Sequence, residues 1–188
     1  MVTLNRIYTR TGDQGLTRLA SGAPVAKFDP RVEAYGSVDE TNACLGLVRL
    51  HTADLPRLDA VLGRVQNELF DLGADLATPG ETPGALRIVD SQVERLEAEI
   101  DDLNADLAPL SSFVLPGGSA AAAALHLART VCRRAERDTV KLAQTSGEQV
   151  GAPALKYLNR LSDLLFVASR WANHQGQGDV LWAPGATR

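Results

Sequence analysis

The stretch PALKYLNRLSDLLFVASRWANH, residues 153–174, has the spacing of a helix with two apolar sides. One side carries apolar residues at three- and four-residue steps: Leu158, Leu161, Leu165 and Ala168. A second side carries three more: Leu164, Val167 and Trp171. A helix that is apolar on two sides is buried on two sides. We expect the first side in the core of a helical bundle and the second against another copy of the chain.

A polar stripe separates these two sides. Its spacing of four, three and four residues keeps its members in one row along the helix: Asn159, Asp163, Phe166 and Arg170. A polar row at the edge of an interface can hold a ligand, so we expect part of a binding site there.

Helical signals also recur before this stretch. Asp29 is expected as the N-cap and Pro30 as the first residue of a helix that runs to about His51. Asp90 is expected to cap another helix, whose narrow apolar stripe leaves an acidic side toward solvent. With these two, the periodicity predicts helices over residues 30–51, 55–76, 91–107, 119–144 and 153–174.

The chain is therefore predicted to be all-α, an up-and-down five-helix bundle over residues 29–175. An ordered N-terminal arm, residues 1–28, precedes the bundle, and a tail, residues 176–188, follows it. No repeat of fixed period and no long linker interrupts residues 1–188, so we expect a single domain.

Composition limits the function classes. The 188 residues are 45% hydrophobic but only 5% aromatic, so the core must be packed from Leu, Ala and Val. The net charge of −4 argues against a protein that coats nucleic acid, so an anion site needs a local group of arginines.

Cys44 and Cys132 lie in apolar helical patterns, which predicts buried free thiols and a reducing compartment. The absence of a long apolar run argues against a membrane span or a secretion signal, and we expect a cytoplasmic protein.

The helix over residues 119–144 carries such a group of arginines. Its core side is predicted to hold Ala124, Ala128, Val131, Ala135 and Leu142, and its opposite side Arg129, Arg133, Glu136 and Arg137. Arg133 and Arg137 are four residues apart, so they repel each other unless an anion or an acidic partner lies between them. The alternative is an ordinary solvated face.

The arm contains a second polar group, IYTRTGDQGLTRL, residues 7–19. Gly12 and Gly15 allow backbone N–H groups to turn toward an anion, and the threonines add hydroxyl donors. Phosphate is therefore the first candidate ligand, although the stretch lacks both the P-loop and the dinucleotide-binding pattern. The alternative is a polar arm that ends in a Gly-Asp-Gln-Gly turn.

The first predicted helix offers further candidate site residues, but the histidines do not. Asp39 and Asn42 are three residues apart between Gly36 and Gly46, which would let a ligand or another backbone approach. The alternative for Asp39 is an ordinary exposed acid. The three histidines are scattered, and the sequence offers no di-iron motif and no nucleophile–base set.

Five blocks resemble, in order and spacing, the signature of the PduO-type ATP:cob(I)alamin adenosyltransferases. They are YTRTGDQGLT (8–17), RVEAYGSVDETNACLG (31–46), FVLPGG (113–118), CRRAER (132–137) and YLNRLSDLLF (157–166). The resemblance implies transfer of the 5′-deoxyadenosyl group of ATP to the cobalt of cob(I)alamin, with release of triphosphate. Cobalt(I) is itself a strong nucleophile, which would explain why no catalytic base is found.

The resemblance also implies an assembly and a set of site residues. It implies a homotrimer with sites between neighbouring subunits, in which Asp39 pairs with Arg133 across the interface. The implied ATP-binding residues are Thr9, Arg10, Thr11, Gly12, Thr17, Arg18, Lys27, Arg133, Glu136, Arg137 and Asn159. The implied cobalamin-binding residues are Phe113, Asp163 and Phe166, and the implied catalytic residues are Arg133, Asp39 and Phe113. Mg²⁺ would arrive with ATP, without assigned protein ligands.

The resemblance further implies that cob(II)alamin is reduced with electrons from a reductase and that a client enzyme takes the product. Two alternatives remain open at this point. One is a helical phosphoryl-transfer enzyme, which would cleave ATP at a phosphate. The other is a non-catalytic bundle whose arginines bind an acidic partner or a nucleotide.

Overall fold

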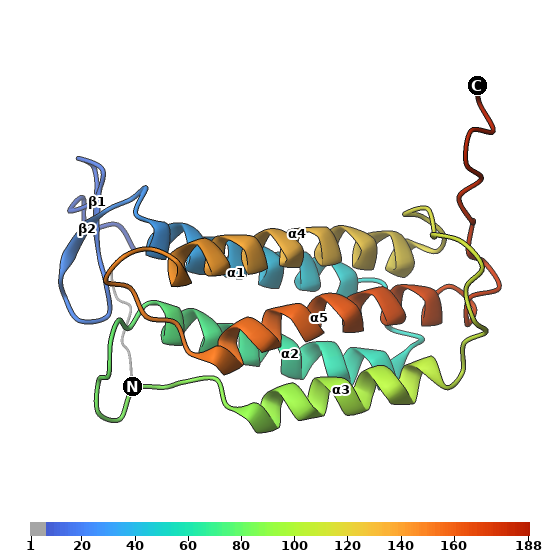
Figure 1. The fold of residues 1–188 in the computed structure, drawn as a ribbon, viewed down its shortest axis with the longest axis horizontal. Coiled ribbons are helices and arrows are strands. Elements are labelled where there is room, and N and C mark those ends of the chain that lie inside the picture. The colour runs from blue at the N-terminus through green and yellow to red at the C-terminus, as the bar shows by residue number, and fades with distance from the viewer. Residues whose placement is uncertain (1–6) are drawn as a thin grey trace.

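The computed structural model describes residues 7–188, and within that range it contains five helices and two short strands (Figure 1). The helices are α1 (Pro30–Arg49), α2 (Pro56–Leu76), α3 (Asp90–Asn104), α4 (Ala120–Ala143) and α5 (Ala152–Trp171). Successive helices run in opposite directions, so the predicted up-and-down five-helix bundle is confirmed. Residues 1–6 of the predicted arm lie outside the described residues.

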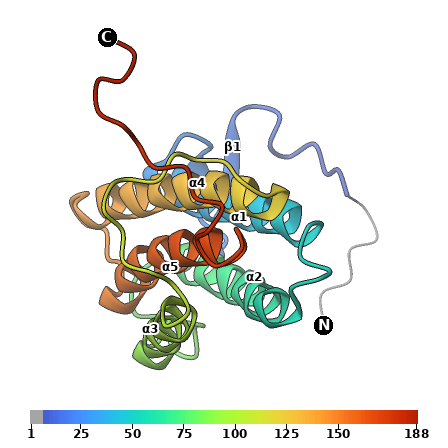
Figure 2. The same cartoon turned by 90° about the vertical axis from the view of Figure 1, so that its right-hand side faces the viewer.

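The helices are not stacked in sequence order. α1 packs between α2 and α4, and α5 packs between α4 and α3 (Figure 2). α4 approaches both neighbours with small residues, since Ala121, Ala128 and Ala135 are all buried. The core contains mostly Leu, Ala and Val, as the low aromatic content predicts.

The expectation that a second copy buries one side of α5 is wrong. Leu164 is fully buried within the single chain, where α3 packs against α5. Trp171 is likewise engaged inside the chain, because its Nε1 donates to Asp106 Oδ2 at 3.0 Å and the guanidinium of Arg57 lies over its ring. The periodicity shows that a helix side is apolar, but not which helix covers it.

The two predicted helix caps differ in outcome. Asp29 caps α1 as predicted, and its Oδ1 accepts a hydrogen bond from Arg31 N at 2.8 Å. Asp90 is not a cap, because the N-cap is Val89, whose N–H donates to Gln92 Oε1 at 3.0 Å. The Asp90 carboxylate instead accepts from Lys156 Nζ on α5 at 3.1 Å.

Both cysteines are free, and only one of them is buried as predicted. Cys132 lies in the core, where burial raises the pKa of its thiol. Cys44 is half-buried on α1. None of the helices in residues 7–188 combines the length and the apolar character that a membrane crossing requires.

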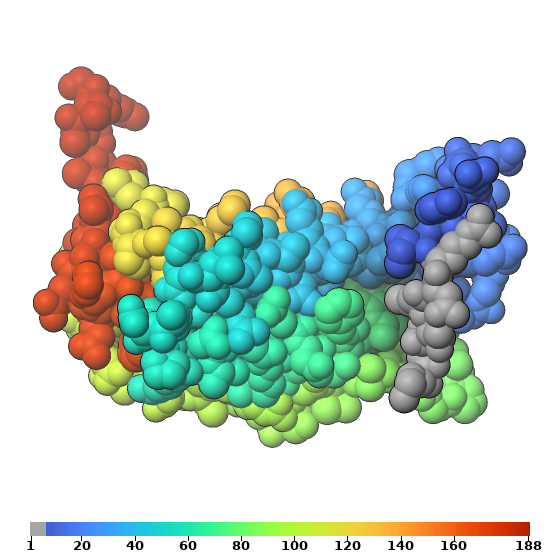
Figure 3. All heavy atoms as spheres, turned by 180° about the vertical axis from the view of Figure 1, so that it is seen from behind, coloured from blue at the N-terminus to red at the C-terminus, as the bar shows by residue number. Residues whose placement is uncertain are grey.

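The arm and the tail lie at opposite ends of the bundle (Figures 1 and 3). The arm folds into an antiparallel hairpin of β1 (Leu16–Arg18) and β2 (Pro24–Ala26), in which Thr17 pairs with Val25. The sequence analysis did not predict this hairpin.

The beginning of the tail is docked onto the loop between α3 and α4. Leu181 forms an antiparallel bridge with Val114, in the loop between α3 and α4. Leu115 N donates to Val180 O at 2.8 Å, and Trp182 N donates to Phe113 O at 2.7 Å. Backbone groups in this loop have no helical partners, and the tail satisfies them.

The burial of Leu164 gives a stability prediction. Leu164→Ala is expected to lower the free energy of unfolding by about 2–5 kcal/mol, because it removes a fully buried side chain and leaves a cavity. Leu86→Ala, at a position 51% exposed, is the matched control and should cost less than about 0.5 kcal/mol. Urea unfolding measures both, and equal values would mean that α3 does not bury this side of α5.

Candidate functional site

The arm forms a polar hollow beside the hairpin. Its volume is about 470 Å³, and its lining is Thr9, Thr11, Gly12, Leu16, Thr17, Arg18, Pro24 and Lys27. Six of the residues predicted to bind ATP are therefore brought together. Arg10 does not line this hollow, because its backbone is left-handed at φ 62° and its guanidinium lies 5.6 Å from the centre of the Tyr8 ring.

Backbone hydrogen bonds shape this hollow. Gly15 N donates to Gly12 O at 3.2 Å, which closes the predicted Gly-Asp-Gln-Gly turn. Lys27 N donates to Gly15 O at 2.8 Å, so the lysine is held opposite the turn. The hollow thus offers hydroxyl groups, a lysine and an arginine, which are donors suited to an anion.

The arm is fixed to the bundle through the end of α2. Ala20 N donates to Ala77 O at 3.1 Å. Arg31, which is 1% exposed, donates through Nη1 to Leu76 O at 2.5 Å and forms an ion pair with Glu148 in the loop before α5. The buried arginine therefore holds the start of α1, just after the arm, against two other segments.

A second polar group lies where α4 and α5 meet. Arg133 and Arg137 are exposed, and Arg137 Nη1 donates to the Arg133 carbonyl at 2.9 Å. Glu136 Oε1 accepts from Asn159 Nδ2 at 3.0 Å, which joins the two helices. Partial desolvation raises the pKa of Asp163, while the charges of Arg160 and Arg133 oppose that rise.

Neighbouring residues on α1 and α4 point elsewhere. Arg134 forms an ion pair with Glu40 on α1, so it does not join Arg133 and Arg137. Asp39 is exposed, and within residues 7–188 it forms no ion pair with Arg133 of the same chain. Asn42 does not accompany Asp39, because its side chain is buried and donates to Gln66 O on α2 at 3.0 Å.

An apolar hollow lies at the opposite end of the bundle from the arm. Its volume is about 630 Å³, and its lining is Leu110, Ser111, Ser112, Phe113, Val114, Arg129, Phe166 and Trp182. Phe113 is 77% exposed, and its ring centre lies 6.1 Å from that of Trp182. The structure therefore brings together Phe113 and Phe166, two residues predicted to contact cobalamin.

Arg129 and Trp182 also line this hollow, and neither was predicted as a cobalamin-binding residue. Arg129 lies one helical turn before Arg133, and burial together with the charge of Arg133 lowers its pKa. Its spacing from Arg133 was the signal that placed it on the predicted arginine side of the helix, but not at the apolar hollow. Trp182 gave no such signal, because the tail has no helical periodicity.

Arg170 is the one member of the predicted polar stripe that does not face outward. It is 6% exposed, and its Nε donates to Asp179 Oδ2 in the tail at 2.8 Å. The prediction that this stripe binds a ligand is therefore wrong at Arg170. Its acidic partner, Asp179, lies in the tail, where the helical spacing gives no information.

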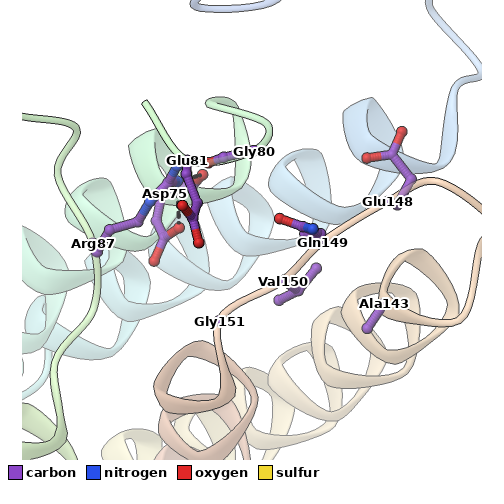
Figure 4. A pocket seen from close by; sticks show the side chains of 9 residues that line it. All are labelled: Asp75, Gly80, Glu81, Arg87, Ala143, Glu148, Gln149, Val150 and Gly151. Carbon is purple, nitrogen blue, oxygen red and sulfur yellow. Dashed lines mark hydrogen bonds and ion pairs between the residues drawn. The ribbon is translucent and has the colours of Figure 1, made fainter. Parts of the chain in front are cut away.

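A further hollow of about 590 Å³ lies between the ends of α2 and α4, and no predicted site residue lines it (Figure 4). Asp75 and Arg87 dominate one wall, with Arg87 Nη1 2.8 Å from Asp75 Oδ1. Asp75 Oδ2 accepts from Ile88 N at 2.9 Å. Both carboxylate oxygens are therefore occupied in holding the loop before α3.

Comparison with known proteins gives a consistent result. A family model described as cobalamin adenosyltransferase matches residues 7–172. The chain belongs to this family. It is 51% identical over 190 residues to the corrinoid adenosyltransferase of Mycobacterium tuberculosis strain H37Rv, covering 100% of this chain and 97% of that protein. It is 43% identical over 179 residues to the corrinoid adenosyltransferase of Bacillus subtilis strain 168, covering 93% of this chain and 91% of that protein.

A solved member of the family has the same fold. It is a variant PduO-type ATP:corrinoid adenosyltransferase from Lactobacillus reuteri complexed with cobalamin and ATP. The TM-score is 0.89 at 40% sequence identity, over 95% of this chain and 97% of that chain. The resemblance stated from the sequence is confirmed.

The arm hollow gives a prediction for ATP binding. A Cβ at Gly12 would lie 3.2 Å from Leu16 O and 3.2 Å from Lys27 Nζ. Gly12→Ala is therefore expected to displace Lys27 and weaken ATP binding by up to about 1.5–3 kcal/mol, the range for a hydrogen bond to a charged group. Gly73→Ala, where a Cβ meets nothing within 4 Å, is the matched control. Calorimetry with ATP alone measures both, and equal affinities would contradict a role for this hollow.

Proposed function

We propose that this corrinoid adenosyltransferase works as a homotrimer with its sites between neighbouring copies. The reaction transfers the 5′-deoxyadenosyl group of ATP to the cobalt of cob(I)alamin and gives adenosylcobalamin and triphosphate. One observation carries the shared site: the arm hollow and the Phe113 hollow lie at opposite ends of α4, whose 24 residues span about 36 Å. One bound ATP cannot connect both ends, whereas the arm of a neighbouring copy could supply the missing half.

The outer surface of α1 and α4 supports contact with another copy. Leu47 is 54% exposed and Leu127 is 53% exposed. Each lies seven residues from a member of the Glu40–Arg134 ion pair, so both face the same side of this helix pair. In the proposed trimer this surface is covered, and Asp39 of one copy meets Arg133 of the next.

The proposed chemistry needs charge stabilisation and positioning. The cobalt(I) electron pair attacks C5′, the C5′–oxygen bond breaks, and triphosphate leaves with the bonding electrons. Lys27 from the arm, with Arg133 and Arg137 from α4, would stabilise the leaving triphosphate by preorganised positive charge. Glu136 and Asn159, already joined across α4 and α5, would orient the nucleoside part.

Magnesium is proposed to enter as the ion of ATP. In the part of the chain that the structure describes, no three His, Cys, Asp or Glu side chains are grouped to hold a metal. Mg²⁺ would therefore be held chiefly by the triphosphate, and we assign no step to it.

The corrin is proposed to occupy the Phe113 hollow, which Phe166 also lines, and to contact Asp163, three residues before Phe166 on α5. An apolar side chain below the cobalt excludes the axial ligand and water, which makes cobalt(II) easier to reduce. Phe113 suits this role because it is exposed and outside the core. The electron would come from a reductase and the product would pass to a client enzyme, both in the cytoplasm.

The test is an anaerobic assay with chemically reduced cobalamin and ATP, followed by visible spectroscopy. The wild-type enzyme should produce the spectrum of an alkylcobalamin together with triphosphate. Orthophosphate or pyrophosphate without alkylcobalamin would support phosphoryl transfer instead, and ATP binding without turnover would support a non-catalytic nucleotide-binding protein.

Two arginine variants test the α4 face by calorimetry with ATP. Arg137→Ala should weaken ATP binding by about 1.5–3 kcal/mol, because it removes a charge-assisted contact with triphosphate. Arg134→Ala is the control, since Arg134 is paired with Glu40 and should matter less for ATP. Calorimetry that finds the same loss in both variants would refute this assignment.

A further inference from the structure

Three residues near the end of α5 form a buried polar cluster, which we name the clamp: Arg170, Asn173 and Asp179. Arg170 Nε donates to Asp179 Oδ2 at 2.8 Å, and Asn173 Nδ2 donates to Asp179 Oδ1 at 3.1 Å. The side chains of Arg170 and Asp179 are 8% and 5% exposed, and Asn173 is 4% exposed. Both carboxylate oxygens are therefore satisfied inside the protein.

The clamp holds the loop that carries Phe113 on both sides. Before Phe113, Arg170 Nη2 donates to Ala108 O at 3.0 Å. After Phe113, Ser119 N donates to Asn173 Oδ1 at 3.0 Å, where α4 begins. The third member, Asp179, lies in the tail three residues before Trp182. The Phe113 loop, the start of α4 and the tail are thus held together around the Arg170–Asp179 ion pair.

Two glycines make room for the clamp. A Cβ at Gly178 would stand 2.7 Å from Asn173 Oδ1, closer than real contacts allow, and a Cβ at Gly118 would also overlap this atom. Gly118 has φ +96°, a conformation that side chains rarely adopt. The backbone is therefore fitted closely around the Asn173 amide.

Beyond the clamp, the tail runs beside the Phe113 loop. The bridge of Val114 with Leu181 and the bond from Trp182 N to Phe113 O align the two segments. Ser112 Oγ also donates to Trp182 O at 2.8 Å. Phe113 and Trp182 are 77% and 45% exposed, so core packing does not fix their rings. Their positions depend on these backbone contacts between the loop and the tail, and on the clamp, which fixes the tail just before them.

We infer that Arg170, Asn173 and Asp179 are positioning residues for the corrin, which act by fixing Phe113 and Trp182 on one wall of the apolar hollow. This inference rests on the proposed function of that hollow. The clamp touches neither substrate, since its side chains are buried behind the loop. Its effect should therefore fall on cobalamin and on the coordination of cobalt(II), but not on ATP, whose arm hollow lies at the other end of the bundle.

The test uses Asp179→Asn, which keeps the shape of the side chain but removes the charge that pairs with Arg170. Trp171→Phe is added, because the chain has two tryptophans and Trp182 is then the only tryptophan whose fluorescence is measured. Relative to Trp171→Phe alone, the KM for cobalamin should rise about tenfold or more. A loss of this size is typical when a residue that orients the contacting groups of a metal site is mutated. The KM for ATP should not change, and the four-coordinate cob(II)alamin signal and the quenching of Trp182 by cobalamin should both decrease.

The matched control is Asp75→Asn in the same background. Asp75 also forms a buried ion pair, with Arg87, but at the opposite end of the bundle. This variant should leave the KM for cobalamin and the Trp182 quenching unchanged, whatever its cost in stability. An equal cobalamin defect in Asp75→Asn would overturn the inference.

Amide hydrogen exchange separates the inference from the proposed function. In the Asp179→Asn variant, the N–H groups of Leu115 and Trp182 should exchange faster, while those of the arm should not. Faster exchange with unchanged cobalamin kinetics and quenching, or unchanged exchange, would contradict a positioning role.

If the single variant does not fold, Arg170→Met with Asp179→Asn avoids an unpaired buried charge. A wild-type protein that never forms adenosylcobalamin would contradict the proposed function, while Trp182 quenching would still test the clamp.

Discussion

The architecture depends on one constraint: α5 is apolar on two sides and must be covered on both. α4 covers one side and α3 the other, so α5 lies between these two helices. The remaining outward edge of α5 is polar and lies beside the arginines of α4. The polar group with Glu136, Asn159 and Asp163 thus lies along the edge of α5 that the core leaves uncovered.

The length of α4 then determines what one chain can build. The donors suited to phosphate are in the arm at the C-terminal end of α4, and the aromatic hollow is at its N-terminal end. Each end is tied down separately, by Arg31 at the arm and by the clamp at the Phe113 loop. Bringing the adenosyl carbon to the cobalt therefore calls for a second copy, which is the basis of the proposed trimer.

The sequence predicted what depends on local periodicity and fixed signals. All five helices were found, and Asp29 was identified as a cap, because these features are encoded within a few residues. Most of the errors concern partners distant in sequence, although Asp90 was wrongly predicted as a cap from local signals. The apolar side of α5 is covered by α3, and Arg170 pairs with Asp179 in a tail without periodic pattern. The glycines and threonines of the arm indicated a phosphate site from the sequence alone. Lys27 and Phe113 could be assigned only through family resemblance, since an isolated exposed side chain carries no pattern of its own.

The central claim is that one site takes its arm from one copy and its α4 face from the next, and subunit complementation tests this most directly. Lys27→Ala with Arg18→Ala damages only the arm half, and Arg133→Ala with Arg137→Ala damages only the α4 half. When the two inactive proteins are mixed and allowed to exchange subunits, about a quarter of the sites should combine two intact halves and recover activity. A mixture of exchanged subunits that stays as inactive as its components would contradict the shared site.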